Sequence, residues 1–193
     1  MKIATSDTHP LYVNWLWPPD DPAHQGGLGL TIAPGKQGPG LTAYWKRDLE
    51  TDLARLKELG VTVLAPLLTD EELETLGISG YVDAARSQGL EVLRFPFPDG
   101  GVPEGHAELD GFLVRLAARL HADEAVVVHC RGGLGRAGLV CACLLLHLGE
   151  CRTGPDAVAR IRGTRSARAV ETREQERFVD EHADFISSRG RAG

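Results

Sequence analysis

The segment from Ala125 to Leu148 constrains the fold more than any other part of the chain. Residues 125–128 are apolar and include three valines, which predicts a strand buried on both faces of a sheet. Glycines at 132, 133 and 135 follow and predict a tight turn. Residues 137–148 are apolar nearly all round, which predicts a central buried helix. A buried strand that turns into a buried helix is typical of a parallel α/β sheet.

The rest of the chain continues this alternation of strands and helices. Apolar spacing predicts helices over residues 44–59, 80–88, 104–121, 155–162 and 171–187. Apolar runs predict strands over 11–16, 28–33, 61–68 and 90–95. We therefore expect a single α/β domain over residues 28–188, with a mainly parallel central sheet flanked by helices. Residues 1–27, which are rich in proline, are expected to form an irregular segment packed on that domain.

Thr69 and Glu72 form the pattern of a capping box, which predicts a short helix ending near residue 77. The run Asp70-Glu71-Glu72 then indicates a solvated helix start, where carboxylates are favoured by the helix dipole.

Composition excludes several classes of protein. The chain has 193 residues, of which 42% are hydrophobic and 25% charged, so disorder and collagen-like structure are excluded. Its longest apolar run, 139–148, is far shorter than the ~20 residues of a membrane span. The first residues lack the apolar stretch of a secretion signal. A net charge of −6 argues against a nucleic-acid partner.

The four cysteines all lie within residues 130–151, too close together to form a disulfide framework and wrongly spaced for paired zinc ligands. We therefore expect a cytoplasmic protein with no metal, no cofactor and at most one special thiol. Cys141 and Cys143 lie in an apolar run and are expected to be buried small hydrophobic residues. We expect the protein to be a monomer.

The turn over residues 130–136 has the composition of a phosphate site. Its glycines allow backbone N–H groups to turn inward, and with the helix N-terminus they form a nest that binds a dianion. Cys130 lies at the base of this nest, where positive potential favours the nucleophilic thiolate. Arg136 faces the same centre and can hold two phosphate oxygens. Cys-x5-Arg alone is weak evidence, but a strand, a glycine turn and a helix around it make the pattern specific.

With its flanking residues, this loop resembles the signature of the cysteine-dependent protein tyrosine phosphatase superfamily, in the kinase-associated group of its dual-specificity branch. The likeness covers roughly residues 28–187. It rests on Gly29-Leu30, Ala33-Pro34-Gly35, Pro98-Asp99-Gly100-Gly101, His129-Cys130, Gly132-Gly133-Leu134-Gly135-Arg136 and Ala142-Cys143-Leu144-Leu145-Leu146. The resemblance implies a protein tyrosine phosphatase-like fold and a dual-specificity-phosphatase-like catalytic domain over 28–188.

The resemblance also implies a role for each residue of the site. Cys130 is the nucleophile, Arg136 clamps the phosphate, and Asp99, on a mobile loop, is the general acid. Residues of the loop that bind phosphate are Arg131, Gly132, Gly133, Leu134, Gly135 and Arg136. Supporting residues are His129, which holds the loop, Ala137, which follows the arginine, and Gln175, which aligns with a glutamine near the attacking water.

Three positions are unusual for this family. Ala137 stands where the family has Ser or Thr, whose hydroxyl stabilises the departing thiolate, so we expect slow hydrolysis of the intermediate. Glu171 stands where the family relative has Gln, which puts the positioning of the second-step water in doubt. Arg131 stands where phosphoinositide 3-phosphatases of the superfamily carry Lys, so a more highly charged substrate is conceivable.

The expected activity is hydrolysis of phosphate monoesters through a phosphocysteine intermediate. The expected partner is a phosphorylated protein, with a kinase among the candidates, or another phosphomonoester; phosphotyrosine leads and phosphoserine and phosphothreonine follow. Three alternatives stay open. They are a phosphoinositide phosphatase, a rhodanese-like sulfurtransferase, because rhodanese loops also begin Cys-Arg-x-Gly, and a phosphate-binding pseudophosphatase with slow turnover. In a sulfurtransferase Asp99 would have no role.

Overall fold

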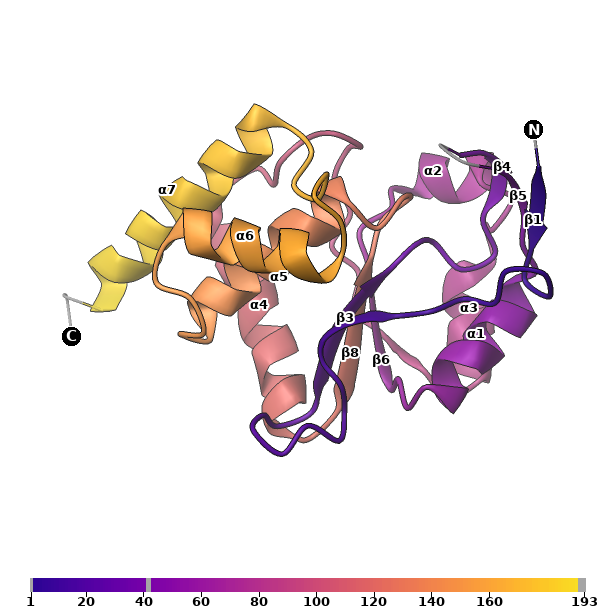
Figure 1. Cartoon of the computed structure of the whole chain (residues 1–193), viewed down its shortest axis with the longest axis horizontal. Coiled ribbons are helices and arrows are strands. Elements are labelled where there is room, and N and C mark those ends of the chain that lie inside the picture. The colour runs from indigo at the N-terminus through magenta and orange to yellow at the C-terminus, as the bar shows by residue number, and fades with distance from the viewer. Residues whose placement is uncertain (1, 41–42, 191–193) are drawn as a thin grey trace.

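A five-stranded sheet forms the centre of the computed structural model, which describes residues 2–40 and 43–190 (Figure 1). Its strands, in spatial order, are β2 (Asn14–Trp17), β3 (Gly27–Thr31), β8 (Ala125–His129), β6 (Val63–Pro66) and β7 (Glu91–Val92). β2 is antiparallel to β3, and the other three pairings are parallel. The predicted α/β class with a mainly parallel sheet is confirmed, although the sheet is mixed at its β2 edge.

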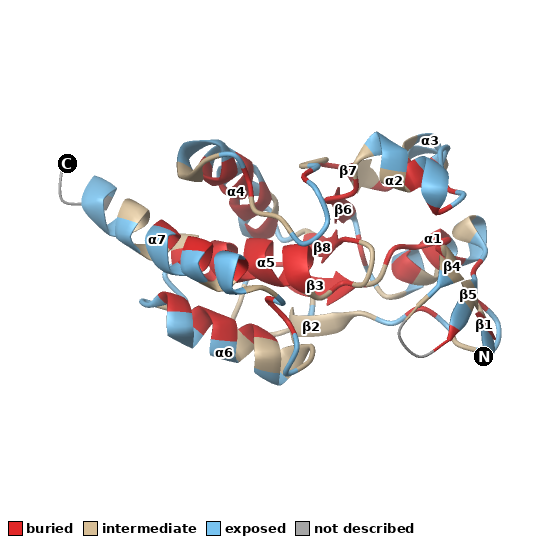
Figure 2. Ribbon diagram, turned by 90° about the horizontal axis from the view of Figure 1, so that it is seen from above, coloured by how far each residue is buried: buried red, intermediate tan, exposed pale blue. Residues whose placement is uncertain are grey.

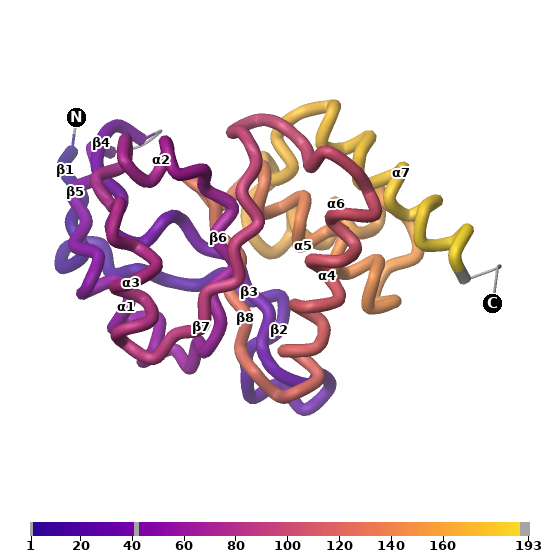
Figure 3. The backbone as a smooth tube through the Cα atoms, turned by 180° about the vertical axis from the view of Figure 1, so that it is seen from behind, coloured from indigo at the N-terminus to yellow at the C-terminus, as the bar shows by residue number. Residues whose placement is uncertain are grey.

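Helices cover both faces of this sheet (Figures 1 and 3). One face carries α1 (Leu49–Glu58), α2 (Asp70–Thr75) and α3 (Tyr81–Ser87), and the other carries α4 (His106–His121), α5 (Gly135–His147), α6 (Gly154–Thr164) and α7 (Arg173–Gly190). Side chains of β8 alternate between the two cores, because Val126 and Val128 pack with α4–α7 while Val127 packs with α1–α3. This two-sided burial explains the continuous apolar run in the sequence.

Helix α5 lies at the centre of the larger core, as predicted. Every residue from Gly135 to Leu146 is buried (Figure 2). A Cβ at Gly138 would lie 3.0 Å from the backbone N of Val170, so glycine allows the segment before α7 to pack against α5. Cys141 and Cys143 are fully buried, and burial raises the pKa of both thiols. They behave as the small apolar residues expected from the sequence.

The helix predicted over residues 44–59 is wrong in its first part. Residues 44–46 form a strand, β5 (Tyr44–Lys46), in a small second sheet with β1 (Ile3–Thr5) and β4 (Gln37–Pro39). α1 starts only after Asp48, whose side chain accepts a hydrogen bond of 2.8 Å from the Thr51 N–H. Trp45 matches the helical spacing of the later apolar residues by coincidence. It lies before the Asp48 cap, and that cap fixes the start of α1.

Two further boundaries differ from those predicted. β2 starts at Asn14 rather than at residue 11, and β7 has two residues rather than six. Beyond β7 the chain still runs beside β6 and its continuation, with hydrogen bonds from Leu93 N–H to Leu64 O, from Phe95 N–H to Pro66 O and from Phe97 N–H to Leu67 O.

Strands β1 and β2 lie within the first 27 residues, so this segment has more regular structure than its composition predicted. A domain boundary at residues 27/28 stays a prediction. Within residues 2–40 and 43–190, no helix has the length and apolar character to cross a membrane.

Candidate active site

Three parallel strands end level with one another, because Thr31 of β3, His129 of β8 and Pro66 of β6 are in register. Ligand sites in α/β sheets form at this carboxyl edge. Here His129 is followed by Cys130, which is only 2% exposed, and the chain then turns into α5 at Gly135. The predicted strand, turn and helix are therefore confirmed.

Gly133 is the tightest point of the turn. Its φ is +64°, and a Cβ there would lie 2.2 Å from the carbonyl oxygen of Thr31. A side chain at this position would therefore both strain the backbone and collide with β3. Glycine allows the loop to sit directly on the end of the sheet.

The outer side of the turn is held by Arg165, at the end of α6. Its Nε donates to Gly133 O at 3.0 Å and its Nη2 donates to Gly132 O at 3.1 Å. In a trans peptide the N–H points opposite to the C=O, so the amides of Gly133 and Leu134 are directed away from Arg165. The guanidinium thereby fixes the orientation of two of the amides that the sequence predicts for phosphate. Nothing in the sequence near Arg165 indicated this contact.

Arg136 is completely buried and held on several sides. Its Nη1 donates to the carbonyl oxygens of Leu67 at 3.1 Å and Phe97 at 2.8 Å. Both terminal nitrogens bind the carboxylate of Glu72, at 2.7 and 2.6 Å, and Nη2 lies 3.0 Å from Asp99 Oδ1. The Nε is buried and has no hydrogen-bond partner in the described part of the chain. This donor is therefore left for a ligand.

The charges of this cluster stabilise one another. Burial by itself disfavours the guanidinium ion, but hydrogen bonds to Glu72 and the negative charges of Cys130, Glu72 and Asp99 raise the pKa of Arg136. Burial likewise opposes ionisation of Glu72, but hydrogen bonds from Arg136 and Thr69 lower the pKa of that carboxyl. Arg136 and Glu72 therefore form an ionised, hydrogen-bonded pair.

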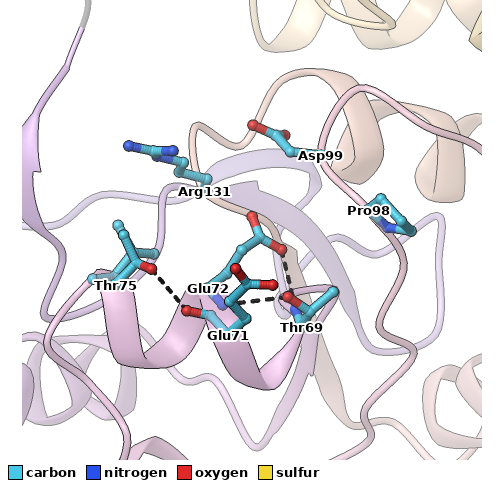
Figure 4. Close-up of a pocket in the computed structure, with 8 residues that line it drawn as sticks. Thr69, Glu71, Glu72, Thr75, Pro98, Asp99 and Arg131 are labelled. Carbon is cyan, nitrogen blue, oxygen red and sulfur yellow. Dashed lines mark hydrogen bonds between the residues drawn. The ribbon is translucent and has the colours of Figure 1, made fainter.

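Glu72 is a site residue that sequence reasoning missed. The predicted capping box is present, with 3.1 Å from Thr69 N to Glu72 Oε2 and 3.3 Å from Glu72 N to Thr69 Oγ1. A fully solvated helix start is nevertheless wrong, because the Glu72 side chain is 18% exposed and also binds Arg136. Figure 4 shows it rising from the first turn of α2 below Asp99 and Arg131. Its place just after a predicted strand was the available signal.

Asp99 lies in the loop between β7 and α4, with its side chain 57% exposed. Gln175, which is fully buried in α7, supports this loop. Its Nε2 donates to Gly101 O at 3.0 Å, and its Oε1 accepts from the Glu171 N–H at 2.9 Å. The structure thus brings Asp99 to Arg136 and ties its loop to α7. A place for Gln175 near the attacking water stays a prediction.

His129 anchors the first residue of the loop. It is fully buried, its Nε2 lies 2.6 Å from the hydroxyl oxygen of Tyr81, and its Nδ1 lies 3.5 Å from Cys130 O. Burial lowers the pKa of His129 to about 4, so the ring is neutral near pH 7. Tyr81 of α3, which the sequence did not single out, fixes the orientation of the ring.

The three positions that are unusual for the family also lie at the site. Ala137 is buried in the first turn of α5. A Cβ at Gly135 would lie 2.7 Å from Glu171 Oε2, so the Glu171 carboxylate is packed against the same turn. Arg131 lines the pocket of about 270 Å³ that contains Cys130. In the described residues, no group of three or more His, Cys, Asp and Glu side chains is placed to hold a metal ion.

Comparison with known proteins identifies the family. Residues 39–179 match the family model described as "Swiss Army Knife protein, DSP-PTPase phosphatase domain". The chain belongs to this phosphatase family. It is therefore a cysteine-dependent phosphatase of the protein tyrosine and dual-specificity type, and the match favours this activity over the sulfurtransferase alternative.

Relatives of this phosphatase include the cyclin-dependent kinase inhibitor 3 proteins. The one from Rattus norvegicus is 29% identical over 190 residues, which cover 96% of this chain and 87% of the relative. The one from Homo sapiens is 28% identical over 179 residues, with 93% and 82% coverage. The predicted resemblance to the kinase-associated group is confirmed.

Solved structures agree with this assignment. Kinase-associated phosphatase, in a form whose catalytic-site cysteine is replaced by serine, superposes with a TM-score of 0.81 at 26% identity, covering 93% of this chain and 97% of that one. The active form of Tk-PTP superposes with a TM-score of 0.67 at 25% identity, covering 85% and 98%.

Proposed function

We propose that this phosphatase removes phosphate from phosphorylated proteins, acting on phosphotyrosine and also on phosphoserine and phosphothreonine. The observation that carries the proposal is the setting of Arg136. It is buried beside the Cys130 loop and fixed on one edge by Glu72, and its Nε has no partner among residues 2–40 and 43–190. A guanidinium held in this way can grip two oxygens of a phosphate group that sits over the thiol.

In the first step the Cys130 thiolate attacks phosphorus in line with the leaving oxygen. A P–S bond forms and the P–O bond breaks, while the loop amides and Arg136 hold the three equatorial oxygens. Asp99 donates its proton to the leaving oxygen, which departs as the alcohol. The exposed side chain of Asp99 and the glycines that follow it allow the small movement that this transfer requires.

In the second step water attacks the phosphocysteine. Asp99, now ionised, accepts a proton from the water, the P–S bond breaks, and inorganic phosphate leaves as the thiolate is restored. The side chains of Glu171 and Gln175 lie against Gly135 in the first turn of α5, which supports the proposal that they flank the path of this water. Because Ala137 offers no hydroxyl to the departing thiolate, this step limits the rate.

We further propose a phosphoprotein partner, with a protein kinase as the leading candidate. Support comes from the similarity to kinase-associated phosphatase and to cyclin-dependent kinase inhibitor 3. A monomeric protein in a reducing, cytoplasmic compartment fits the four cysteines, which are all free thiols.

The test is the Cys130→Ser variant, assayed on an aryl phosphate and on a phosphotyrosine peptide. Serine is a poor nucleophile without a general base, so we expect kcat to fall at least about a thousandfold while the fold is retained. The matched control is Cys151→Ser, which alters a partly exposed thiol in the segment between α5 and α6 and should keep wild-type turnover. Substantial turnover by Cys130→Ser would refute the cysteine mechanism.

A further inference from the structure

The catalytic pocket is part of a longer groove. The pocket of about 270 Å³ contains Cys130, and a second pocket of about 320 Å³ lies against α2. Asp99 and Arg131 line both, so the two pockets meet at these residues. Figure 4 shows both side chains above α2, among the residues that line the second pocket. We call them the thiol-side pocket and the α2-side pocket.

Lys36 is a buried cation in the thiol-side pocket that the proposed mechanism does not use. It follows β3, is only 6% exposed, and lines the pocket with Cys130. Its backbone is fixed, because Lys36 O accepts from the Arg47 N–H at 3.2 Å and the preceding Gly35 N–H donates to Asp52 at 2.8 Å. Within residues 2–40 and 43–190 the Lys36 ammonium has neither a hydrogen bond nor an ion pair.

Arg131 is a second cation without an ion-pair partner in the described chain. It lies close enough to Lys36 to act on it, since burial first and the charge of Arg131 second lower the pKa of Lys36. The negative groups that line the same pocket are Cys130, Asp99 and Glu171. The charges of Cys130 and Asp99 change during the reaction, because Cys130 becomes bonded to phosphorus and Asp99 holds the proton that it donates in the first step. Glu171 lines the pocket but forms no ion pair with Lys36 or Arg131 in the described residues. Two like charges held together without a directly paired carboxylate favour the arrival of an anion.

We propose, building on the phosphoprotein phosphatase function above, that Lys36 and Arg131 form a second anion subsite that selects an acidic side chain next to the phosphorylated residue. The substrate class is a phosphopeptide segment with a Glu or Asp flanking the phosphoresidue. Loop amides and Arg136 bind the phosphate that reacts, so these two outer cations are free for the neighbouring carboxylate.

The α2-side pocket favours a peptide over a compact, multiply phosphorylated ligand. Its lining includes Glu71 and Asp99, which repel additional phosphates, and the apolar side chains of Leu76 and Pro98. A groove with Lys36 at one end and Glu71, Leu76 and Pro98 at the other suits an extended chain with unlike side chains on the two sides of the phosphoresidue.

The experiment compares phosphopeptides that differ only by Glu or Gln at one position, over three positions on each side of the phosphoresidue. For wild type we expect kcat/KM to be roughly tenfold higher for Glu at the position that faces Lys36, the size of a hydrogen bond to a charged partner. The Lys36→Met variant should bring this Glu/Gln ratio close to one, and Lys36→Arg should preserve most of it. The control Lys57→Met, on the exposed side of α1, should leave the ratio as in wild type.

The Glu/Gln ratio makes the result independent of small losses of folded protein, because both peptides meet the same enzyme. A wild-type ratio near one at all six positions would overturn the proposal, and so would a ratio that survives in Lys36→Met. Faster turnover of a soluble inositol bisphosphate than of every peptide would overturn the choice of a peptide. If wild type turned over no peptide at all, the proposed function would fail; the binding affinities of the paired peptides would then carry the same ratio and decide the subsite separately.

Discussion

The site is made of two parts that the chain supplies in different ways. Residues 129–136 are continuous and contain the thiol, the loop amides and the phosphate-binding arginine; we call them the contiguous part. Around them lies the assembled part, which comes from widely separated segments: Lys36, Glu72, Tyr81, Asp99, Arg165 and Gln175. The contiguous part holds the groups that react, and the assembled part fixes their direction and charge. Variants in only one of the two parts therefore show how much each part contributes to catalysis and to stability.

The largest expected effect in the assembled part is that of Glu72→Gln. This change removes the Glu72 charge and leaves the buried Arg136 with the exposed Asp99 as its remaining carboxylate partner, so we expect the free energy of unfolding to fall by about 3 kcal/mol. We expect kcat/KM for an aryl phosphate to fall about a hundredfold, because the glutamine amide can accept only one of the two hydrogen bonds that fix the plane of the guanidinium. Chemical denaturation and steady-state kinetics measure the two quantities.

Two further variants separate the two roles of Glu72, which are capping α2 and pairing with Arg136. Thr69→Ala removes the helix cap but keeps the pair with Arg136, and should cost about 1 kcal/mol of stability. Glu74→Gln, on the exposed side of α2, should change neither quantity. Wild-type kinetics in Glu72→Gln would show that the contiguous part orients Arg136 by itself.

The next largest effect is the dependence of the free energy of unfolding on pH. The pKa of His129 is lowered to about 4 by burial, and the pKa of His182 is lowered to about 4 by burial and by the nearby His106. An unfolded histidine titrates near pH 6.5, so between pH 6.5 and 4 the unfolded state binds more protons and stability falls as the pH falls. Each group contributes at most about 3 kcal/mol by pH 4.

His182→Phe tests this pH dependence away from the site. Both ring nitrogens of His182 are buried and have no hydrogen-bond partner among the described residues, and the ring packs with Phe178 and Phe185. We expect His182→Phe to flatten the decline of unfolding free energy below pH 6.5, while the share from His129 remains. Urea denaturation at a series of pH values would show it. An unchanged slope would mean that the His182 ring is not held in its neutral form.

Arg165→Met should have a smaller effect, on binding more than on chemistry. Without the guanidinium, the peptides of Gly132 and Gly133 can rotate, so we expect competitive inhibition by inorganic phosphate to weaken about tenfold with a smaller change in kcat. Added guanidinium ion should restore part of the affinity. Arg168→Met, in the same loop and exposed, is the control. A loss of thermal stability alone, with unchanged inhibition, would assign Arg165 to packing.

The smallest expected effect is that of Ala137→Ser, which tests how the thiolate of the contiguous part is stabilised as it leaves phosphorus. A hydroxyl at the first turn of α5 could hydrogen-bond the departing thiolate, so we expect kcat to rise by up to about tenfold. Wild type should show a burst of phenol before steady state, and the burst should shrink in the variant. If rapid mixing revealed no burst and kcat did not respond, another group would stabilise the thiolate.

The difference between the two parts explains what the sequence could predict. Strand, glycine turn and helix follow one another directly in residues 125–148, so local rules predicted their geometry and placed Cys130 and Arg136 together. Glu72 and Arg136 are 64 positions apart and Arg165 and Gly132 are 33 apart, and no local pattern encodes such pairings. Asp99 was predicted from a family resemblance and not from its spacing. Likewise, the early strand β5 depends on partners at residues 3–5 and 37–39, so its own pattern was ambiguous.

The order of the strands in the sheet also determines which residues meet at the site. β3, β8, β6 and β7 lie side by side, and the segments that follow them supply Lys36, Cys130, Glu72 and Asp99 in that order. Once the strand order is known, these residues form one row along the edge of the sheet. Predicting that order from the sequence would have brought Lys36 and Glu72 to the site.

Because the Glu72 carboxylate both caps α2 and grips Arg136, opening of this six-residue helix and loss of catalysis are the same event. Short helices open locally far more often than the sheet beneath them unfolds. Mild heating or a low concentration of denaturant should therefore inactivate the enzyme while the sheet and the larger core remain folded. Hydrogen exchange at the α2 amides should accelerate in parallel with that inactivation. Exchange in this helix would then report loss of activity before the protein unfolds globally.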